Sequence, residues 1–262
     1  MAQGDRILPT GQHLADAAMW LGSRLSRFFL PPLCLSCHCG ITTQNALCAT
    51  CWSQLHFIEK PLCPVSGLPF AFDPGPGMLS AAVIASPPPY DAARAVLRYD
   101  DVSGRIIHRY KYGDRMEVAP AMAAWMARAG ADLLGDATLV APVPLHRARL
   151  FSRRFNQSAE LARHLGHRVR VAVVPDLLLR IKATQPQVGL SGQARRRNVA
   201  GAFKVNPRFS DKVVGKVVVL IDDVMTTGAT IEACARVLKA SGASEVRVLT
   251  FARVVPQGDT PI

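Results

Sequence analysis

The sequence predicts an α/β protein, a parallel sheet flanked by helices, preceded by a small four-cysteine metal-binding module. From residue 81 onward, strand-like and helix-like segments alternate, which is typical of a parallel sheet whose two faces are covered. Six of the seven cysteines lie between Cys34 and Cys63, in a short stretch ahead of that region. Hydrophobic residues make up 49% of the 262 residues, which supports a sizeable core and excludes a disordered chain.

Each element of this fold follows from its hydrophobic pattern. The predicted strands cover residues 81–86, 93–101, 137–143, 217–221 and 245–252. The predicted helices cover residues 104–113, 116–129, 156–165 and 229–240. No internal repeat is expected. The segments group into an N-terminal helix over 1–30, a metal-binding module over 31–70 and an α/β domain over 80–255, with the Pro/Gly-rich stretch 68–77 as the boundary.

The N-terminal helix is amphipathic. Leu14, Ala18, Leu21, Leu25 and Phe28 recur at helical spacing, and Arg24 and Arg27 lie off their face. Packing of this face on its own domain is favoured, and binding to a membrane surface is the alternative. No run of about 18 apolar residues predicts a membrane span, and the start lacks the layout of a secretory signal, so a cytoplasmic protein is expected.

The net charge of +12 and the pI of about 9.9 bear on partners more than on fold. They favour anionic partners such as phosphates, nucleic acid or an acidic lipid surface. A scattered positive surface without a specific partner is the alternative.

The clustered cysteines have metal-ligand spacing. Cys34, Cys37, Cys48 and Cys51 form two C-x2-C pairs, and two such pairs suit a tetrahedral, structural zinc. A reduced buried cluster or a redox dithiol is the alternative. A closed four-sulfur site has no open position for chemistry, so its expected role is to hold a small ribbon.

Two further cysteines near these pairs are not assigned as ligands. His38 and Cys39, which follow the first pair directly, are alternative ligands. Cys39 is expected instead to be a buried thiol or one that lies beside the ligands, and Cys63 is expected to be structural.

The stretch VVVLIDDVMTTGAT, residues 217–230, carries the ligand prediction. Asp222 and Asp223 are expected at the carboxyl end of a buried parallel strand, where open α/β sheets bind ligands. The turn that follows offers backbone N–H groups, hydroxyls and a helix N-terminus to one phosphate. Carboxylates beside a phosphate cradle suit the vicinal hydroxyls of a sugar phosphate. The expected binding residues are Asp222, Asp223, Thr226, Thr227, Gly228, Ala229 and Thr230.

This stretch resembles the phosphoribosyl pyrophosphate (PRPP) motif of type I phosphoribosyltransferases, which has two acidic residues followed by a Thr-Thr-Gly-x-Thr-like loop. A generic strand–aspartate–turn–helix unit is the alternative. The stretches 90–115, 141–162 and 180–203, with the two C-x2-C pairs, are similar to the ComF-like (ComFC, GntX-like) subfamily. The sequence departs from relatives at Ser66, where many carry a further cysteine, at Arg154, where many have glycine, and at Thr226, where purine-salvage relatives have an acid.

The resemblance implies Mg²⁺-assisted displacement of pyrophosphate from the ribose C1 by a nitrogen nucleophile. It places Arg147 and Arg149 near the pyrophosphate and a mobile loop around residues 181–192 over the site. It also implies a role in DNA uptake or the handling of single-stranded DNA.

Arg195, Arg196 and Arg197 are candidates for nucleic-acid contact, or else the exposed face of a helix. Phe155, Tyr110 and Tyr112 lie near basic residues and offer base stacking, or else belong to the core. The alternatives to the ComF-type function are a salvage phosphoribosyltransferase with an unknown acceptor, a non-catalytic nucleic-acid-binding protein and a zinc-ribbon adaptor.

Overall fold

The computed structural model describes residues 32–112, 116–146, 155–182 and 192–256, apart from the side chains at 192, 193, 195 and 196. The chain divides into two compact units, Met1–Trp52 and Ser53–Ile262, and each is described by itself. The expected N-terminal helix at 12–30 lies outside the described residues. Within the part of the chain that is described, no helix is both long enough and apolar enough to cross a membrane.

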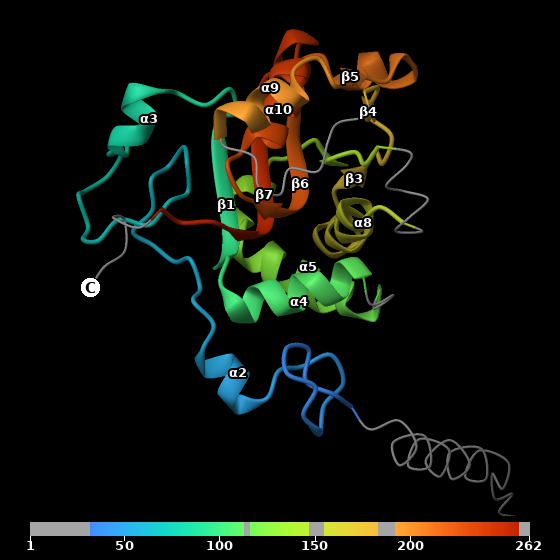
Figure 1. The fold of residues 1–262 in the computed structure, drawn as a ribbon. Coiled ribbons are helices and arrows are strands. Elements are labelled where there is room, and N and C mark those ends of the chain that lie inside the picture. Colours follow the sequence, from blue (N-terminus) through green and yellow to red (C-terminus); the bar gives the residue numbers. More distant parts are fainter. Residues whose placement is uncertain (1–31, 113–115, 147–154, 183–191, 257–262) are drawn as a thin grey trace, which may run out of the picture. The chain divides into compact units, whose positions relative to one another are not determined.

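The larger unit is built on a five-stranded sheet with the strand order β1-β7-β6-β2-β3 (Figure 1). Every neighbouring pair in this sheet is parallel. The strands are β1 (Ala92–Arg98), β2 (Leu139–Pro142), β3 (Ala172–Val173), β6 (Val217–Met225) and β7 (Glu245–Arg253). The predicted parallel α/β fold is therefore confirmed.

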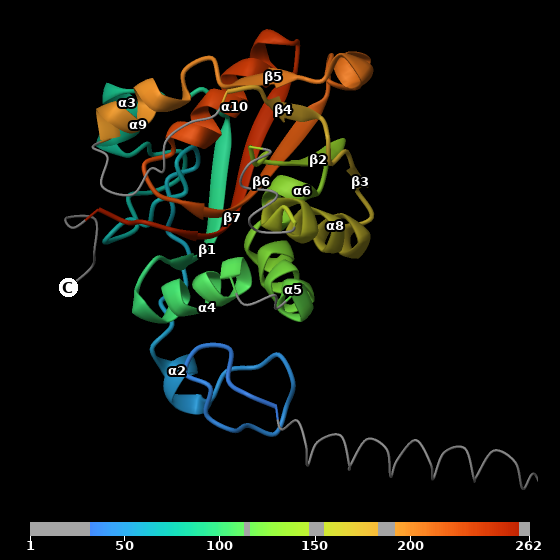
Figure 2. The same ribbon diagram turned by 45° about the vertical axis from the view of Figure 1, so that its right-hand side comes forward.

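The helices cover both faces of this sheet, as Figures 1 and 2 show. The chain passes from β1 through α4 (Asp101–Tyr112), α5 (Ala119–Ala129) and α6 (Ala131–Leu134) to β2, and through α8 (Gln157–Val169) to β3. It passes in the opposite direction from β6 through α10 (Ala229–Ala240) to β7. Because parallel crossovers are right-handed, α5 and α8 lie on one face and α10 lies on the other.

Alternation along β6 divides its side chains between these two layers. Val218 and Leu220 join the core cluster that contains Cys234 and Leu238 of α10. On the other face the α5–α6 junction approaches β7 closely, because a Cβ at Gly130 would lie 2.6 Å from Leu249 Cδ2. Both faces are thus closely packed, which is why the strands are apolar along most of their length.

Shorter elements complete the unit. β4 (Leu178–Arg180) and β5 (Phe203–Val205) form a separate antiparallel pair, and α9 (Gly192–Val199) lies between them in the chain. Two 3-10 turns, Met116–Val118 and Pro207–Lys212, precede α5 and β6. None of β3, β4 and β5 was expected, since three residues or fewer carry too little pattern to recognise.

Several predicted elements differ from the structure. The strand predicted over 93–101 ends at Arg98, since α4 begins at Asp101, and the helix predicted over 156–165 continues to Val169. Residues 81–86, predicted as a strand, form the helix α3 (Ala81–Ala85). A short apolar run does not distinguish the two states, and Ser80, in extended conformation, starts the helix. The strand predicted over 217–221 continues to Met225, because β7 runs beside it as far as Arg253.

The expectation that the chain holds no internal repeat is also wrong. Residues 33–40 and residues 62–69 fold alike, each closed by one antiparallel bridge, Leu33 to Gly40 and Leu62 to Pro69. The first of these turns lies in the smaller unit, before the helix α2 (Ala49–Ser53). The second lies in the larger unit, before α3.

Candidate functional site

The acidic pair occupies a step in the sheet. β2 ends at Pro142, opposite Ile221, whereas β7 continues to Arg253, opposite Met225. Asp222 and Asp223 therefore lie within β6, three and two residues before its end, and not after it as expected. Among the described residues, no strand pairs with them on the β2 side, and Ser158 at the start of α8 contacts Asp222 there.

Asp222 is bound to the first turn of α8. Ser158 Oγ donates a hydrogen bond of 2.8 Å to Asp222 Oδ1, and the Asp223 N–H donates another of 2.9 Å. Burial and then the negative charge of Asp223 raise the pKa of the Asp222 carboxyl to about 7. Its surroundings therefore hold the pKa of the Asp222 carboxyl near neutral pH, as is common for groups at binding sites.

Asp223 has a cationic partner. Lys111 Nζ, near the end of α4, lies 2.9 Å from Asp223 Oδ2, and the Asp223 side chain is only 9% exposed. Because side chains alternate along a strand, Asp223 and Asp222 point to opposite faces of β6. Each carboxylate has about four acceptor positions, so both can still accept hydrogen bonds from a ligand.

Helices α4 and α8 are fixed to each other beside this pair. Tyr110 Oη donates a hydrogen bond of 2.8 Å to the carbonyl of Gln157, and Gln157 Nε2 lies 3.4 Å from the carbonyl of Lys111. Tyr110 is fully buried, so the suggestion that it stacks on bases is wrong. It packs edge-on against Phe155, with ring centroids 6.2 Å apart.

The Thr/Gly turn connects β6 to α10. Gly228 has φ +77°, and a Cβ there would lie 2.9 Å from Met225 Cε, so the turn favours glycine on both counts. Thr226 and Thr227 are exposed, and α10 begins at Ala229. The N–H groups of the first helical turn have no partner within the helix, which makes this end suitable for an anion.

The structure joins some of the predicted residues and leaves others undescribed. Asp222, Asp223 and the turn 226–230 form one continuous segment. Arg147, Arg149 and most of the loop 181–192 lie outside the described residues, as do the side chains of Arg195 and Arg196. Arg197 is exposed on α9, whose backbone confirms a helix there.

Three contributors to the site were missed by sequence reasoning. Ser158 and Lys111 are 64 and 112 positions from their aspartates, a pairing that no local pattern reveals. The role of Asn156 at the start of α8 could have been predicted from the sequence, because asparagine is a preferred N-cap residue. Its Oδ1 accepts from the Ser158 N–H at 3.1 Å and its Nδ2 donates to the Val143 carbonyl at 3.2 Å, so it ties the start of α8 to the end of β2.

The four cysteines of the smaller unit form one cluster. The sulfurs of Cys34, Cys37, Cys48 and Cys51 lie within 4.8 Å of one another. A tetrahedral zinc with bonds of about 2.3 Å has sulfur–sulfur edges of about 3.8 Å, and the Cys37–Cys48 separation is 3.6 Å. Although burial raises the pKa of Cys34, N–H groups of Cys37, Cys48 and Ser36 lower it to about 6. The donor set therefore fits zinc.

Cys39 is outside this cluster. It is exposed rather than buried, and hydrogen bonds with the thiols of Cys37 and Cys48 raise its pKa to about 12. It thus lies beside the four ligands without being one of them. His38, with φ 65°, is also outside the cluster.

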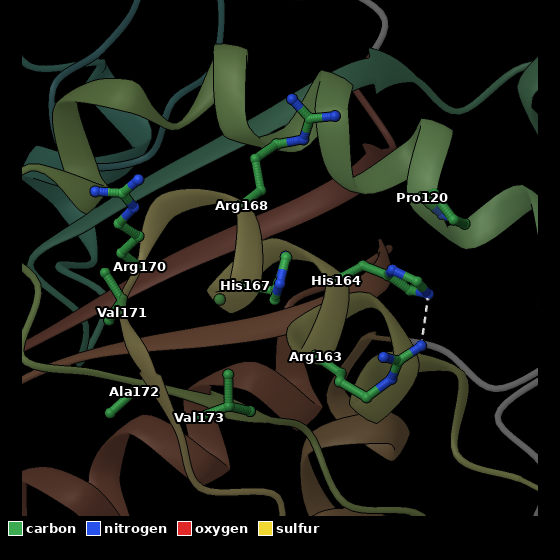
Figure 3. A pocket seen from close by; sticks show the side chains of 10 residues that line it. Pro120, Arg163, His164, His167, Arg168, Arg170, Val171, Ala172 and Val173 are labelled. Atoms are coloured by element: carbon green, nitrogen blue, oxygen red, sulfur yellow. Dashed lines mark hydrogen bonds between the residues drawn. The ribbon is translucent and has the colours of Figure 1, made fainter. Parts of the chain in front are cut away.

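A basic pocket lies toward the other end of α8 (Figure 3). It is lined by Arg163, His164, His167, Arg168 and Arg170 with Pro120 and the residues of β3. Arg163 and His164 contact Glu160 at 2.7 and 3.0 Å. Arg168 and Arg170 are exposed and pair with no acid among the residues that the structure describes. The sequence analysis did not single out this pocket.

Comparison with known proteins agrees with these two parts. Residues 25–82 match the double zinc ribbon domain, and residues 158–259 match the phosphoribosyl transferase domain. The chain is 31% identical over 233 residues to the DNA utilization protein YhgH of Salmonella typhimurium, which covers 86% of this chain and 99% of that protein. It is 25% identical over 224 residues to the competence protein F of Haemophilus influenzae, which covers 80% of this chain and 97% of that protein.

Solved structures match this chain only at low similarity. The allosteric regulatory enzyme of purine biosynthesis has 20% identity and a TM-score of 0.38, over 54% of this chain and 29% of that one. A Trypanosoma cruzi hypoxanthine phosphoribosyltransferase has 17% identity and a TM-score of 0.30, over 52% of this chain and 64% of that one.

The parallel sheet, the acidic pair and the four-cysteine cluster define a phosphoribosyltransferase-like protein with an N-terminal zinc-ribbon module. Within that class, the chain belongs to the ComF/YhgH family.

Proposed function

We propose that this protein binds PRPP, or a related ribose phosphate, together with Mg²⁺ at the end of β6. The observation that carries the proposal is the step in the sheet, where Asp222 and Asp223 adjoin the Gly228 turn and the N-terminus of α10. The turn would bind the phosphate and the carboxylates would accept hydrogen bonds from the ribose hydroxyls. Magnesium, when bound with the ligand, would neutralise charge on the pyrophosphate.

The protein's own residues prepare the site for this ligand. Ser158 orients Asp222, and Lys111 forms an ion pair with Asp223 in a nearly buried position. Lys111 also brings a positive charge to the face of the sheet where an anionic ligand would lie. Transfer of the phosphoribosyl group to a nitrogen nucleophile is the reaction that such a site supports, with the acceptor unidentified.

The place of this activity in the cell is proposed from the relatives. The names DNA utilization protein and competence protein suggest that this protein acts in DNA uptake or in handling incoming single strands, in the cytoplasm. We also propose zinc as the metal of the four-cysteine cluster, where it holds the ribbon together.

Calorimetric titration with Mg²⁺–PRPP tests the ligand, and release of pyrophosphate with a panel of nucleobases tests the reaction. Saturable binding without turnover would support a binding protein rather than a salvage enzyme. Turnover with one base would identify the acceptor. If neither binding nor turnover occurs in the folded, zinc-loaded protein, the proposal is wrong.

Binding of a ribose phosphate is expected to weaken as the pH falls. Asp222 has a pKa of about 7, so at pH 6 about nine-tenths of the molecules carry a neutral Asp222. A neutral carboxyl accepts hydrogen bonds from the ribose hydroxyls more weakly than a carboxylate does. The affinity for ribose 5-phosphate should drop about tenfold between pH 8 and pH 6 beyond the change for inorganic phosphate. Each profile is first corrected for the second ionisation of its own phosphate, which differs between the two ligands. Equal corrected profiles would contradict a role for Asp222.

A second candidate function is binding of single-stranded nucleic acid, and the basic pocket favours it. Arg168 and Arg170 offer two exposed positive charges, with His167 beside them. Phosphate contacts of this kind give an affinity that falls steeply with salt.

Charge reversal tests this second candidate. The variant Arg168→Glu/Arg170→Glu should bind a single-stranded oligonucleotide at least tenfold more weakly and with a salt slope reduced by about 2. The control Lys204→Glu/Arg208→Glu makes the same change in net charge at exposed positions of β5 and the 207–212 turn. Equal losses in both variants would indicate a general charge effect and would contradict a site at the pocket.

A further inference from the structure

The second ribbon, residues 61–85, repeats the backbone of the first ribbon, residues 32–53, at its opening turn. The Cys34 N–H donates to the Cys39 carbonyl and the Cys63 N–H donates to the Leu68 carbonyl, both at 2.9 Å. The N–H groups of Ile41 and Phe70 donate to the carbonyls of Pro32 and Pro61, again both at 2.9 Å. His38 and Gly67 occupy the same place with φ of 65° and 68°. Position 63 therefore corresponds to position 34, and position 66 to position 37.

The repeat extends to the second pair of metal-ligand positions. In the first ribbon the Cys48 N–H lies 3.3 Å from Cys34 Sγ, and α2 follows at once. In the second ribbon the Ser80 N–H lies 3.4 Å from Cys63 Sγ, and α3 follows at once. Cys51 and Val83 are each the third residue of their five-residue helix, and they are 4% and 6% exposed. Positions 80 and 83 thus correspond to 48 and 51.

The residues at these four positions do not fit a zinc ion. Cys63 is the one thiol among them, and Ser66, Ser80 and Val83 take the places of Cys37, Cys48 and Cys51. Structural zinc is held by thiolates and imidazoles, whereas neutral hydroxyls and an aliphatic side chain provide no comparable donor. Among the described residues, the four-cysteine cluster of the first ribbon is the group of side chains that could hold such an ion.

Contacts with the sheet stabilise the second ribbon instead. Arg94 Nη1 donates to the Pro64 carbonyl at 3.0 Å, and Arg253 Nη1 donates to the Ser66 carbonyl. A Cβ at Gly67 would lie 2.1 Å from the Ala93 carbonyl oxygen, so the backbone of the turn packs directly on β1. The first ribbon belongs to a separate unit. A small ribbon without a core of its own needs a metal, and one attached to a large domain does not.

Cys63 has its own local partners in place of a metal. Burial raises the pKa of its thiol, but hydrogen bonds from Ser66 and Ser80 outweigh that effect and lower the pKa to about 7. The buried Arg253 guanidinium lies close enough to interact with this sulfur. The sulfur is fully buried, so its surroundings suit a packed structural thiol rather than a reactive one.

We propose that the second ribbon is a metal-free copy of the first, in which packing on β1 and β7 has replaced the zinc, so that the chain binds one zinc ion rather than two.

Metal content measures this directly. The full-length protein, purified without added metal and then again after incubation with excess zinc and gel filtration, should contain one zinc per chain by mass spectrometry in both states. Cys48→Ser should abolish that zinc, while Cys63→Ser should leave it unchanged. Two zinc ions per wild-type chain, with one lost in Cys63→Ser, would overturn the proposal.

Restoring the ligands provides the complementary test. The variant Ser66→Cys/Ser80→Cys/Val83→Cys should gain a second zinc, because the backbone already holds these positions as the first ribbon does. Replacement of zinc by cobalt should then double the sulfur-to-cobalt charge-transfer absorbance per chain. A variant that folds, judged by its circular dichroism, but keeps a single metal would contradict the structural equivalence of the two ribbons. A variant that does not fold leaves the wild-type stoichiometry as the deciding result.

Discussion

Replacing Asp222 and Asp223 with asparagine is expected to weaken Mg²⁺–PRPP binding at least 100-fold. Hydrogen bonds to a charged group contribute about 1.5–3 kcal/mol each, and two carboxylates together account for about 3 kcal/mol or more. Asparagine keeps the size and the acceptor Oδ1, so the contact from Ser158 can persist. Calorimetric titration measures the loss. Asp211→Asn, at an exposed position of the 207–212 turn, is the matched control and should bind as the wild type does.

The single variant Asp222→Asn separates loss of binding from loss of folding. The folded-state pKa of Asp222, about 7, is above the value of about 3.9 for an unfolded chain. The folded state therefore holds more protons between these values, and its stability falls as the pH rises through this window. At pH 8 the variant should be more stable to urea by up to about 4 kcal/mol, which corresponds to the difference of about 3 between these two pKa values, and near pH 4 it should match the wild type. A variant that binds normally would refute the ribose assignment, and one that is less stable at pH 8 would refute the electrostatic argument.

Removal of zinc is expected to unfold the first ribbon and to leave the larger unit folded. The described part of the smaller unit, residues 32–52, has Leu35 as its one buried side chain that is neither a cysteine nor a serine. Metal binding therefore provides most of the folding free energy of this unit. In zinc-finger peptides the free energy of zinc binding is about 10–16 kcal/mol. The larger unit has a core around β6 and β7 that does not involve the metal.

Hydrogen exchange measures this difference by segment. Chelation of zinc, or Cys48→Ser, should abolish amide protection over 34–52 and retain it over 62–70 and along β6 and β7. Cys234→Ser is the control for loss of a thiol, since Cys234 is buried on α10 in the core of the larger unit. Protection lost together in both units would show that they fold as one, contrary to the division between residues 52 and 53.

The sequence alone predicted those features that depend on neighbouring residues. The five apolar residues before Asp222 predicted a buried strand, and the Thr/Gly turn predicted that a helix, α10, begins at Ala229. The two C-x2-C pairs predicted the four-cysteine cluster, because their spacing is itself the geometric requirement for such a site. The ten positions between the two pairs did not affect this prediction, since a loop of that length can bring the pairs together.

Tertiary structure decided what depends on residues far apart in the chain. The length of β6 follows from its pairing with β7, and β2 ends at Pro142, before it reaches the position opposite Asp222. The partners Ser158 and Lys111 come from two different helices, which only the right-handed crossovers bring to one end of the sheet.

The two ribbons also differ in whether the sequence or the tertiary structure determines their fold. In the first ribbon the ligand spacing was sufficient, because four thiolates specify the metal and the metal specifies the fold. In the second ribbon three of the four ligand positions hold Ser66, Ser80 and Val83, and the pattern disappears from the sequence. Its fold persists because backbone hydrogen bonds and contacts with β1 and β7 depend on main-chain position and not on the lost side chains.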